Sequence, residues 1–209
     1  MQTKIEKISP LSALAVNNIE EVSQNGIEFL SFREKLSFAN ISRIEKRIEW
    51  KGARVAIKSA LDCISLPYPG FFKDEHGKSH PMDGYGFVSL THTKGIAAAI
   101  FNKDMPVGID LDFVREKVVR LGPKFLDSSE INFLNNDPVL YTIAWSAKES
   151  IFKCQGKRGI SLRRNILLEP FCIHDKVIKG KVYQSDFSDH FYNVKVETER
   201  DIVLTYTVW

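Results

Sequence analysis

The feature that most limits the fold is the C-terminal part of the chain, where four β-prone runs follow one another. The runs cover residues 165–169, 177–183, 191–197 and 202–208, and all are rich in β-branched and aromatic residues. Turn-forming residues lie between them. Short runs separated by turns are typical of neighbouring antiparallel strands. We therefore expect a largely antiparallel sheet in this part of the chain.

Helical patterns precede these runs. Residues 114–121, 128–135 and 140–155 read as helices, and Gly156 is well placed to end the third of them. The first half has a similar order, with a helical stretch over residues 19–61 before its β-like runs. Helices segregated from antiparallel strands indicate the α+β class. The repetition predicts two similar lobes joined near residues 104–107.

The longest helix of the first half is expected over residues 42–63. Ser42 is a candidate N-cap, with Glu45 three residues later as its capping-box partner. Ile44, Ile48 and Val55 are expected on its buried face. A narrow stripe of cations lies elsewhere on the same helix: Arg43, Arg47, Lys51, Arg54 and Lys58. The stripe is either a solvated face or an edge that faces an anion.

β-like runs continue in the middle of the chain, over residues 87–90, 95–101 and 107–112. Asn102-Lys103-Asp104 forms a tight turn before the last of these runs. We expect the second and third runs to form a hairpin or adjacent strands.

Composition sets the broad class. The 209 residues are 44% hydrophobic and 26% charged, which is typical of a globular protein. The formal net charge of +3 is too small to indicate nucleic-acid binding by itself. The three cysteines, Cys63, Cys154 and Cys172, match no metal-binding spacing and are expected to be reduced thiols. With neither a signal-peptide pattern nor a membrane-length apolar run, a soluble cytoplasmic protein is expected.

The segment GIDLD, residues 108–112, places two acids on one strand. Side chains alternate along a strand, so Asp110 and Asp112 point to the same side. Two like charges so placed are tolerated at a strand end in water or around a cation. The pair is therefore either a solvated strand terminus or part of a cation site.

The segment WSAKESIFK, residues 145–153, carries three charges on a helical stripe that also holds two aromatic residues. In the simpler interpretation, Glu149 and Lys153 form an exposed i,i+4 ion pair and nothing more. Alternatively, Glu149 joins Asp110 and Asp112 as an oxygen ligand of Mg²⁺, and Lys148 and Lys153 lie beside it and pair with the negative charge of a phosphate.

His92 lies in SLTHTKG at a strand end, and Lys78 lies in the segment GKS. A lone histidine is more often structural than functional. With lysines close in sequence, His92 could instead contact a phosphate.

Taken together, SLTHT, GIDLD and WSAKESIFK resemble the motifs of the 4′-phosphopantetheinyl transferase superfamily, in the family's order. The resemblance covers about residues 46–160, and it is greatest to the larger, two-lobed members that activate peptide-synthetase, fatty-acid and polyketide carrier proteins. It implies two α/β lobes related by pseudo-twofold symmetry, residues 1–104 on the nucleotide side and 105–209 with the catalytic motifs. The site would lie at the lobe interface.

The resemblance also implies residue roles. Asp110 and Glu149 match the family's magnesium ligands, and Asp112 falls where many members have Glu, so it would bind directly or through a water. Glu149 matches the proposed general base, and Lys153 matches the lysine that contacts the pyrophosphate. The remaining matches are residues expected to bind coenzyme A: His92, Lys78, Arg54, Arg47, Lys46 and Lys148.

The implied activity is Mg²⁺-dependent transfer of 4′-phosphopantetheine from coenzyme A to a serine of an apo carrier protein, by a monomeric enzyme. Two other functions stay open. The same acids could serve a magnesium-dependent phosphohydrolase, and the cationic stripe could belong to a binding module without catalysis.

Overall fold

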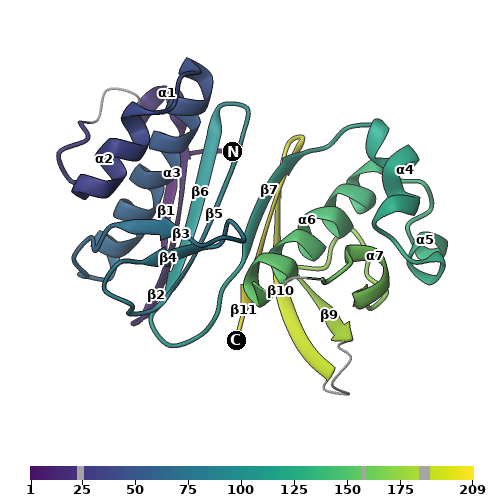
Figure 1. Cartoon of the computed structure of the whole chain (residues 1–209). Coiled ribbons are helices and arrows are strands. Elements are labelled where there is room, and N and C mark those ends of the chain that lie inside the picture. Colours follow the sequence, from purple (N-terminus) through teal and green to yellow (C-terminus); the bar gives the residue numbers. More distant parts are fainter. Residues whose placement is uncertain (23–25, 157–158, 184–188) are drawn as a thin grey trace. The chain divides into compact units, whose positions relative to one another are not determined.

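The computed structural model describes residues 1–22, 26–156, 159–183 and 189–209. Predicted helix residues 23–25 therefore lie outside the described part. The chain divides into two compact units, Met1–Val107 and Gly108–Trp209 (Figure 1). Helices pack against antiparallel sheets within each unit, as expected for the α+β class.

The first unit is built on a four-stranded antiparallel sheet. Its strands lie in the order β1 (Lys4–Ser9), β2 (Ser12–Asn18), β6 (Ile96–Asn102) and β5 (Phe87–Thr93). A short ribbon of β3 (Phe71–Lys73) and β4 (Ser79–Pro81) stands apart from this sheet. The strands β1 and β2 were not predicted from the sequence.

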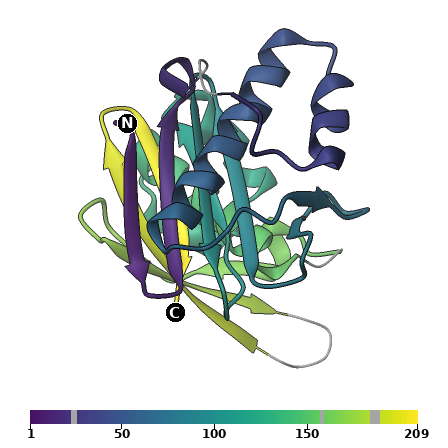
Figure 2. The same ribbon diagram turned by 90° about the vertical axis from the view of Figure 1, so that its left-hand side faces the viewer.

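Helix α3 (Ile44–Cys63) packs against β2 and β6 (Figure 2). Half of its buried residues are small, namely Gly52, Ala53, Ala56 and Ala60. Small side chains let a helix approach a sheet closely, and a Cβ at Gly52 would lie 3.3 Å from the Ala97 side chain on β6.

Two expectations for α3 are wrong. Ile44 and Ile48 are 66% and 40% exposed, because the first two turns of α3 are exposed or half-buried and burial begins at Gly52, whereas Val55 is buried as expected. The helix begins at Ile44 with Arg43 as a cap that makes no side-chain cap hydrogen bond. Ser42 is therefore not the N-cap.

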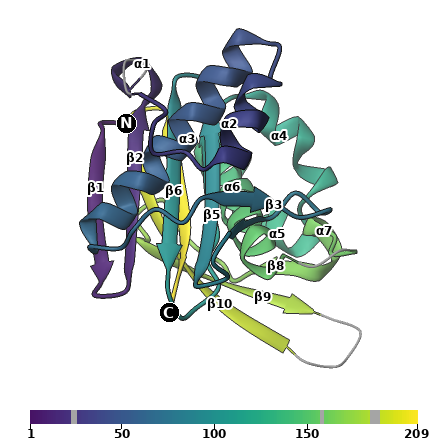
Figure 3. The same ribbon diagram turned by 60° about the vertical axis from the view of Figure 1, so that its left-hand side comes forward.

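Helices α1 (Ile19–Val22) and α2 (Phe32–Ala39) both contact α3 (Figure 3), and a buried ion pair joins α2 to α3. Glu34 Oε1 lies 2.7 Å from Arg54 Nε and accepts the Tyr68 hydroxyl at 2.8 Å. Ser31 caps α2 in a capping box with Glu34. Burial, followed by the nearby Glu34 carboxylate, raises the pKa of Tyr68.

The second unit has a five-stranded antiparallel sheet. The order is β7 (Ile109–Phe113), β11 (Ile202–Val208), β10 (Asp189–Glu199), β9 (Val177–Tyr183) and β8 (Ile166–Leu168). The antiparallel sheet predicted for the tail is thus confirmed. The predicted pairing of residues 95–101 with 107–112 is wrong, because β6 pairs with β2 and β5 whereas β7 pairs with β11.

Helix α6 (Pro138–Gln155) packs against β7, β11, β10 and β8. Asp137 caps its start by accepting the Val139 N–H, and Gly156 ends it with φ of 62°, as predicted. The smaller helices α4 (Lys117–Leu121), η1 (Gly122–Lys124), α5 (Ser128–Phe133) and α7 (Leu162–Asn165) complete the unit. No helix in the described part of the chain has both the length and the apolar character needed to cross a bilayer. The pseudo-twofold relation between the lobes stays a prediction.

Candidate active site

The site begins where β7 and α6 approach each other closely. A Cβ added at Gly108 would lie 1.8 Å from the Ser150 carbonyl oxygen and 2.7 Å from the Cys154 nitrogen. Only glycine tolerates this approach of strand to helix. Gly108 is also held to β11, because its N–H donates to Thr207 Oγ1 and its carbonyl accepts the Thr207 N–H, both at 3.0 Å.

Asp110 is the centre of the polar contacts between β7 and α6. Its carboxylate lies 2.6 Å from Lys153 Nζ through Oδ1 and accepts the Ser146 hydroxyl at 3.0 Å through Oδ2. Lys153 also donates to the Ile109 carbonyl at 3.0 Å. Asp110 is 7% exposed, whereas the Lys153 side chain is 27% exposed. Charge-assisted bonds of this length hold the carboxylate at a fixed place beside α6.

Glu149 lies one turn of α6 from Lys153, and its side chain is half-buried. Burial raises the pKa of Glu149, and the negative charge of Asp110 raises it further, while the Lys153 ammonium opposes both effects. Asp110 and Glu149 are therefore close enough to interact electrostatically, although they lie 39 positions apart in the chain (149 − 110). A pair of carboxylates brought together in this way provides the hard oxygen donors that Mg²⁺ prefers.

Asp112 has a different environment. Its Oδ1 accepts the Phe113 N–H at 2.7 Å and lies 3.8 Å from an Arg115 guanidinium nitrogen. Across the described ranges, no group of three or more His, Cys, Asp or Glu side chains is arranged to hold a metal. The structure thus brings Asp110 and Glu149 together, but it does not assemble the predicted trio with Asp112.

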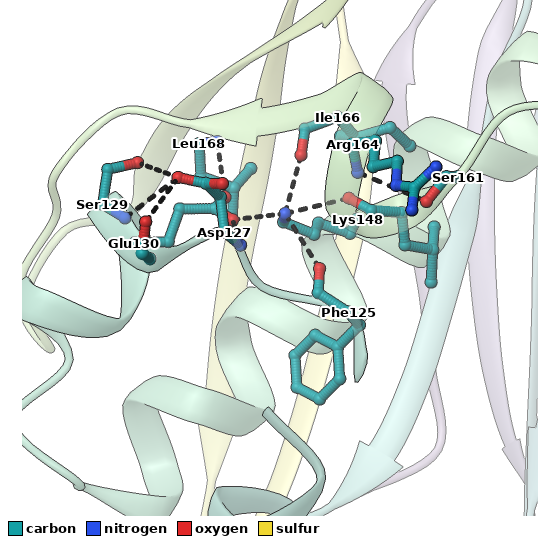
Figure 4. Close-up of polar contacts among 11 residues, drawn as sticks. Phe125, Asp127, Ser129, Glu130, Lys148, Ser161, Arg164, Ile166 and Leu168 are labelled. Carbon is teal, nitrogen blue, oxygen red and sulfur yellow. Dashed lines mark hydrogen bonds and ion pairs between the residues drawn. The ribbon is translucent and has the colours of Figure 1, made fainter. Parts of the chain in front are cut away.

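Lys148 does not join this group. Its side chain is completely buried, and its ammonium contacts Glu130 and three backbone carbonyls (Figure 4). The predicted stripe of residues 145–153 therefore divides between two environments, because Lys148 points into a buried network while Lys153 reaches β7. This placement differs from the expectation that Lys148 lines a phosphate site.

His92 and Lys46, both expected at the coenzyme A phosphate, meet at one carboxylate in the first unit. Glu49 Oε2 lies 2.6 Å from Lys46 Nζ and 3.5 Å from His92 Nδ1. The Lys46 and His92 side chains are 59% and 39% exposed. The structure therefore brings these two predicted residues together.

Arg47 and Arg54 are occupied by partners inside their own unit. Arg47 donates to the Ile41 carbonyl through Nε and Nη2, and its guanidinium lies over the Phe38 ring at 5.4 Å. Arg54 is buried, pairs with Glu34 and lies 4.3 Å from the centre of the Trp50 ring. These contacts give both arginines a structural role in joining α2 to α3.

Lys78 borders a pocket of about 650 Å³ in the first unit. Aromatic and cationic side chains line it together, among them Phe72, Tyr85, Phe87 and Lys103. Rings and ammonium groups side by side suit an aromatic anion. His92, Lys46, Arg47 and Arg54 are not among its lining residues.

Two serines that complete the α6 face were not predicted from the sequence. Ser146 holds Asp110, and Ser150 contacts the Thr205 carbonyl at 3.0 Å and the Thr205 hydroxyl at 2.8 Å. Ser146, Glu149, Ser150 and Lys153 follow offsets of zero, three, four and seven, which is one helical face. A search of the segment for polar as well as charged residues at this spacing would have found them.

The second unit is thus an antiparallel sheet with one long helix that carries an acid and a lysine to an aspartate on the edge strand. Residues 106–207 match the sequence model of the 4′-phosphopantetheinyl transferase superfamily. The second unit belongs to this superfamily, so the resemblance noted from the motifs is confirmed. No curated protein matches the chain. Membership supports a role in phosphopantetheinyl transfer.

Proposed function

We propose that the protein transfers the 4′-phosphopantetheine group of coenzyme A to a serine hydroxyl of an apo carrier protein and releases 3′,5′-ADP. The observation that carries the proposal is the contact of Lys153 with Asp110 at 2.6 Å, with Glu149 beside them. These are the residues that match the family's motifs, and they lie within the segment that matches the family.

The acid pair fits a magnesium ion. Asp110 and Glu149 would hold it, because two nearby carboxylates plus phosphate oxygens form a usual Mg²⁺ environment. Bound there, the ion would neutralise negative charge on the pyrophosphate. Asp112 would contribute from a greater distance, through a water.

The transfer itself is assigned to two side chains of α6. Glu149 takes the proton of the carrier serine as the serine oxygen bonds to the phosphorus next to pantetheine. The bond from that phosphorus to the bridging oxygen breaks, and the oxygen leaves with 3′,5′-ADP. Lys153 uses two of its three N–H groups on Asp110 and Ile109, which leaves one for a phosphate oxygen.

The nucleotide end of coenzyme A is assigned to the first unit. His92 and Lys46 are the proposed 3′-phosphate ligands, because their side chains lie together at Glu49 and are 39% and 59% exposed. Lys78, at the aromatic and cationic pocket, is the proposed contact of the nucleotide. Arg54 and Lys148 are left out of the proposed site because both are buried in ion pairs, and Arg47 because the Ile41 carbonyl and the Phe38 ring hold its guanidinium.

The test is a mass measurement. Purified protein is incubated with coenzyme A, Mg²⁺ and a panel of apo carriers from peptide-synthetase, polyketide and fatty-acid systems. Gain of the phosphopantetheine mass on a carrier serine is expected, together with 3′,5′-ADP. The Asp110→Ala and Glu149→Ala proteins should give none while keeping their fold by circular dichroism.

The alternatives predict other products. Phosphate release from coenzyme A without a carrier would identify a phosphohydrolase. Salt-sensitive binding to DNA without affinity for coenzyme A would identify a binding module. An unmodified carrier across the whole panel would contradict the proposed transfer.

A further inference from the structure

Lys148 is the most buried cation of the second unit's described residues, and its ammonium is fully engaged. The nitrogen lies 2.5 Å from Glu130 Oε2, 2.6 Å from the Ile166 carbonyl, 3.0 Å from the Leu162 carbonyl and 3.1 Å from the Phe125 carbonyl (Figure 4). An ammonium has three N–H groups, so four acceptors leave none for a phosphate. Lys148 therefore does not act as a ligand in this arrangement.

Glu130 is equally well satisfied. Its Oε2 accepts the Asp127 N–H at 2.7 Å, and its Oε1 accepts the Leu168 N–H at 2.9 Å. The first of these bonds belongs to the capping box that starts α5. The pair Lys148–Glu130 thus connects α6 to the start of α5 on one side and to β8 on the other.

The network holds α6 from the side away from β7. Phe125 and Glu130 precede α6 in the chain, whereas Leu162 and Ile166 follow it, so one ammonium fastens both flanking segments to the middle of the helix. On the other side, Ser146 and Ser150 fasten the same helix to β7 and β11. Adjacent residues of a helix point about 100° apart. The contacts on these two sides fix the rotation of α6 about its axis, and that rotation sets the direction in which Glu149 points.

We propose that Lys148, through its pair with Glu130, is a positioning residue that sets the rotation of α6 and thereby aims Glu149 and Lys153 at Asp110. This inference rests on the proposed function only in assigning catalysis to Glu149 and Lys153. It replaces the phosphate-binding role expected for Lys148.

Two variants test the proposal. Lys148→Met/Glu130→Gln removes both charges and so leaves no lone buried charge, whereas Glu130→Gln alone removes the carboxylate but keeps the ammonium on its three carbonyl contacts. Lys58→Met is the matched control, since Lys58 forms an exposed i,i+4 contact with Asp62. All proteins are assayed at a temperature where circular dichroism shows them folded.

We expect kcat of the double variant to fall about 10–100-fold, because a misplacement near 1 Å has costs of this size. KM for coenzyme A should stay within about two-fold, because Lys148 binds no substrate, and Glu130→Gln should show a smaller loss of kcat. Lys58→Met should match the wild type. A raised KM with unchanged kcat would show that Lys148 binds substrate. A lowered melting temperature with unchanged kcat would show that Lys148 has a purely structural role. Either result overturns the proposal.

A second measurement does not depend on activity. The charged groups that face Glu149 are Asp110 and Lys153, and a rotated helix would change its distance from both and its burial. Carboxyl ¹³C NMR titration, with Glu149→Gln to assign the signal, should show a raised pKa in the wild type and a value nearer the ordinary one in the double variant. Should the wild type transfer nothing, this titration still decides the positioning role, and an unmoved Glu149 pKa in both variants overturns it.

Discussion

The substitution Gly108→Ala tests the close approach of β7 and α6. The new Cβ would lie 1.8 Å from the Ser150 oxygen, and ordinary contact begins at 3.4 Å, so the two backbones must separate by about 1.6 Å (3.4 − 1.8). Gly108 is fixed to β11 by two hydrogen bonds, so α6 is the element that must retreat. The obstacle is backbone, which no side-chain rotation relieves.

The expected cost is at the upper end of overpacking, about 3 kcal/mol. For a chain of this size, that corresponds to a melting temperature lower by about 6–12 °C. A retreat of α6 would also lengthen the Lys153–Asp110 contact from its present 2.6 Å, so carrier modification per folded molecule should fall at least about ten-fold.

Thermal unfolding by circular dichroism and the carrier mass assay measure these two effects. Gly26→Ala is the matched control, because its new Cβ would meet only the end of the exposed Glu28 side chain, which can rotate away, and it lies in the first unit. A Gly108→Ala protein with the melting temperature and activity of the wild type would refute the close-packing argument.

Three further outcomes are expected. Asp112→Ala should lose less transfer activity than Asp110→Ala in the carrier assay, and an equal loss would make Asp112 a direct ligand. Glu149→Gln should raise the melting temperature at pH 8 without Mg²⁺ but not at pH 4. The raised pKa of Glu149 means that its protonation favours the folded state, and this stabilisation is lost as pH rises through the folded-state pKa. Arg54→Met should lower the free energy of unfolding by about 3–5 kcal/mol in a denaturant titration, because Glu34 is left buried and unpaired; unchanged stability with lost discrimination between coenzyme A and its 3′-dephospho form would instead make Arg54 a phosphate ligand.

Local patterns predicted the second unit well. The strands β9 and β11 have the predicted bounds, and α6 ends at Gly156, because alternation, β-branched residues and a left-handed glycine cap are all local signals. The meeting of Asp110 with Glu149 and Lys153 was expected from the family's motifs. No local signal gives the distance between residues so far apart in the chain.

The first unit shows where local patterns mislead. Half of the buried residues of α3 are glycine or alanine, whereas the large residues Ile44 and Ile48 lie in its exposed first turns, so residue size misled the prediction. Lys148 shows the second difficulty. Its partner Glu130 is 18 positions away, and a lysine beside a catalytic acid has the same sequence appearance whether it binds a phosphate or another helix.

The strand that carries Asp110 belongs to its sheet through a single neighbour. Among the strands that the structure describes, β7 is an edge strand and pairs only with β11, whose residues lie about ninety positions further along the chain. While the protein is being synthesised, residues 108–156 can emerge and α6 can form, yet β7 has no partner until residues 202–208 have left the ribosome. On the proposed function, nascent chains short of that point should transfer no phosphopantetheine, and competence should arise in one late step.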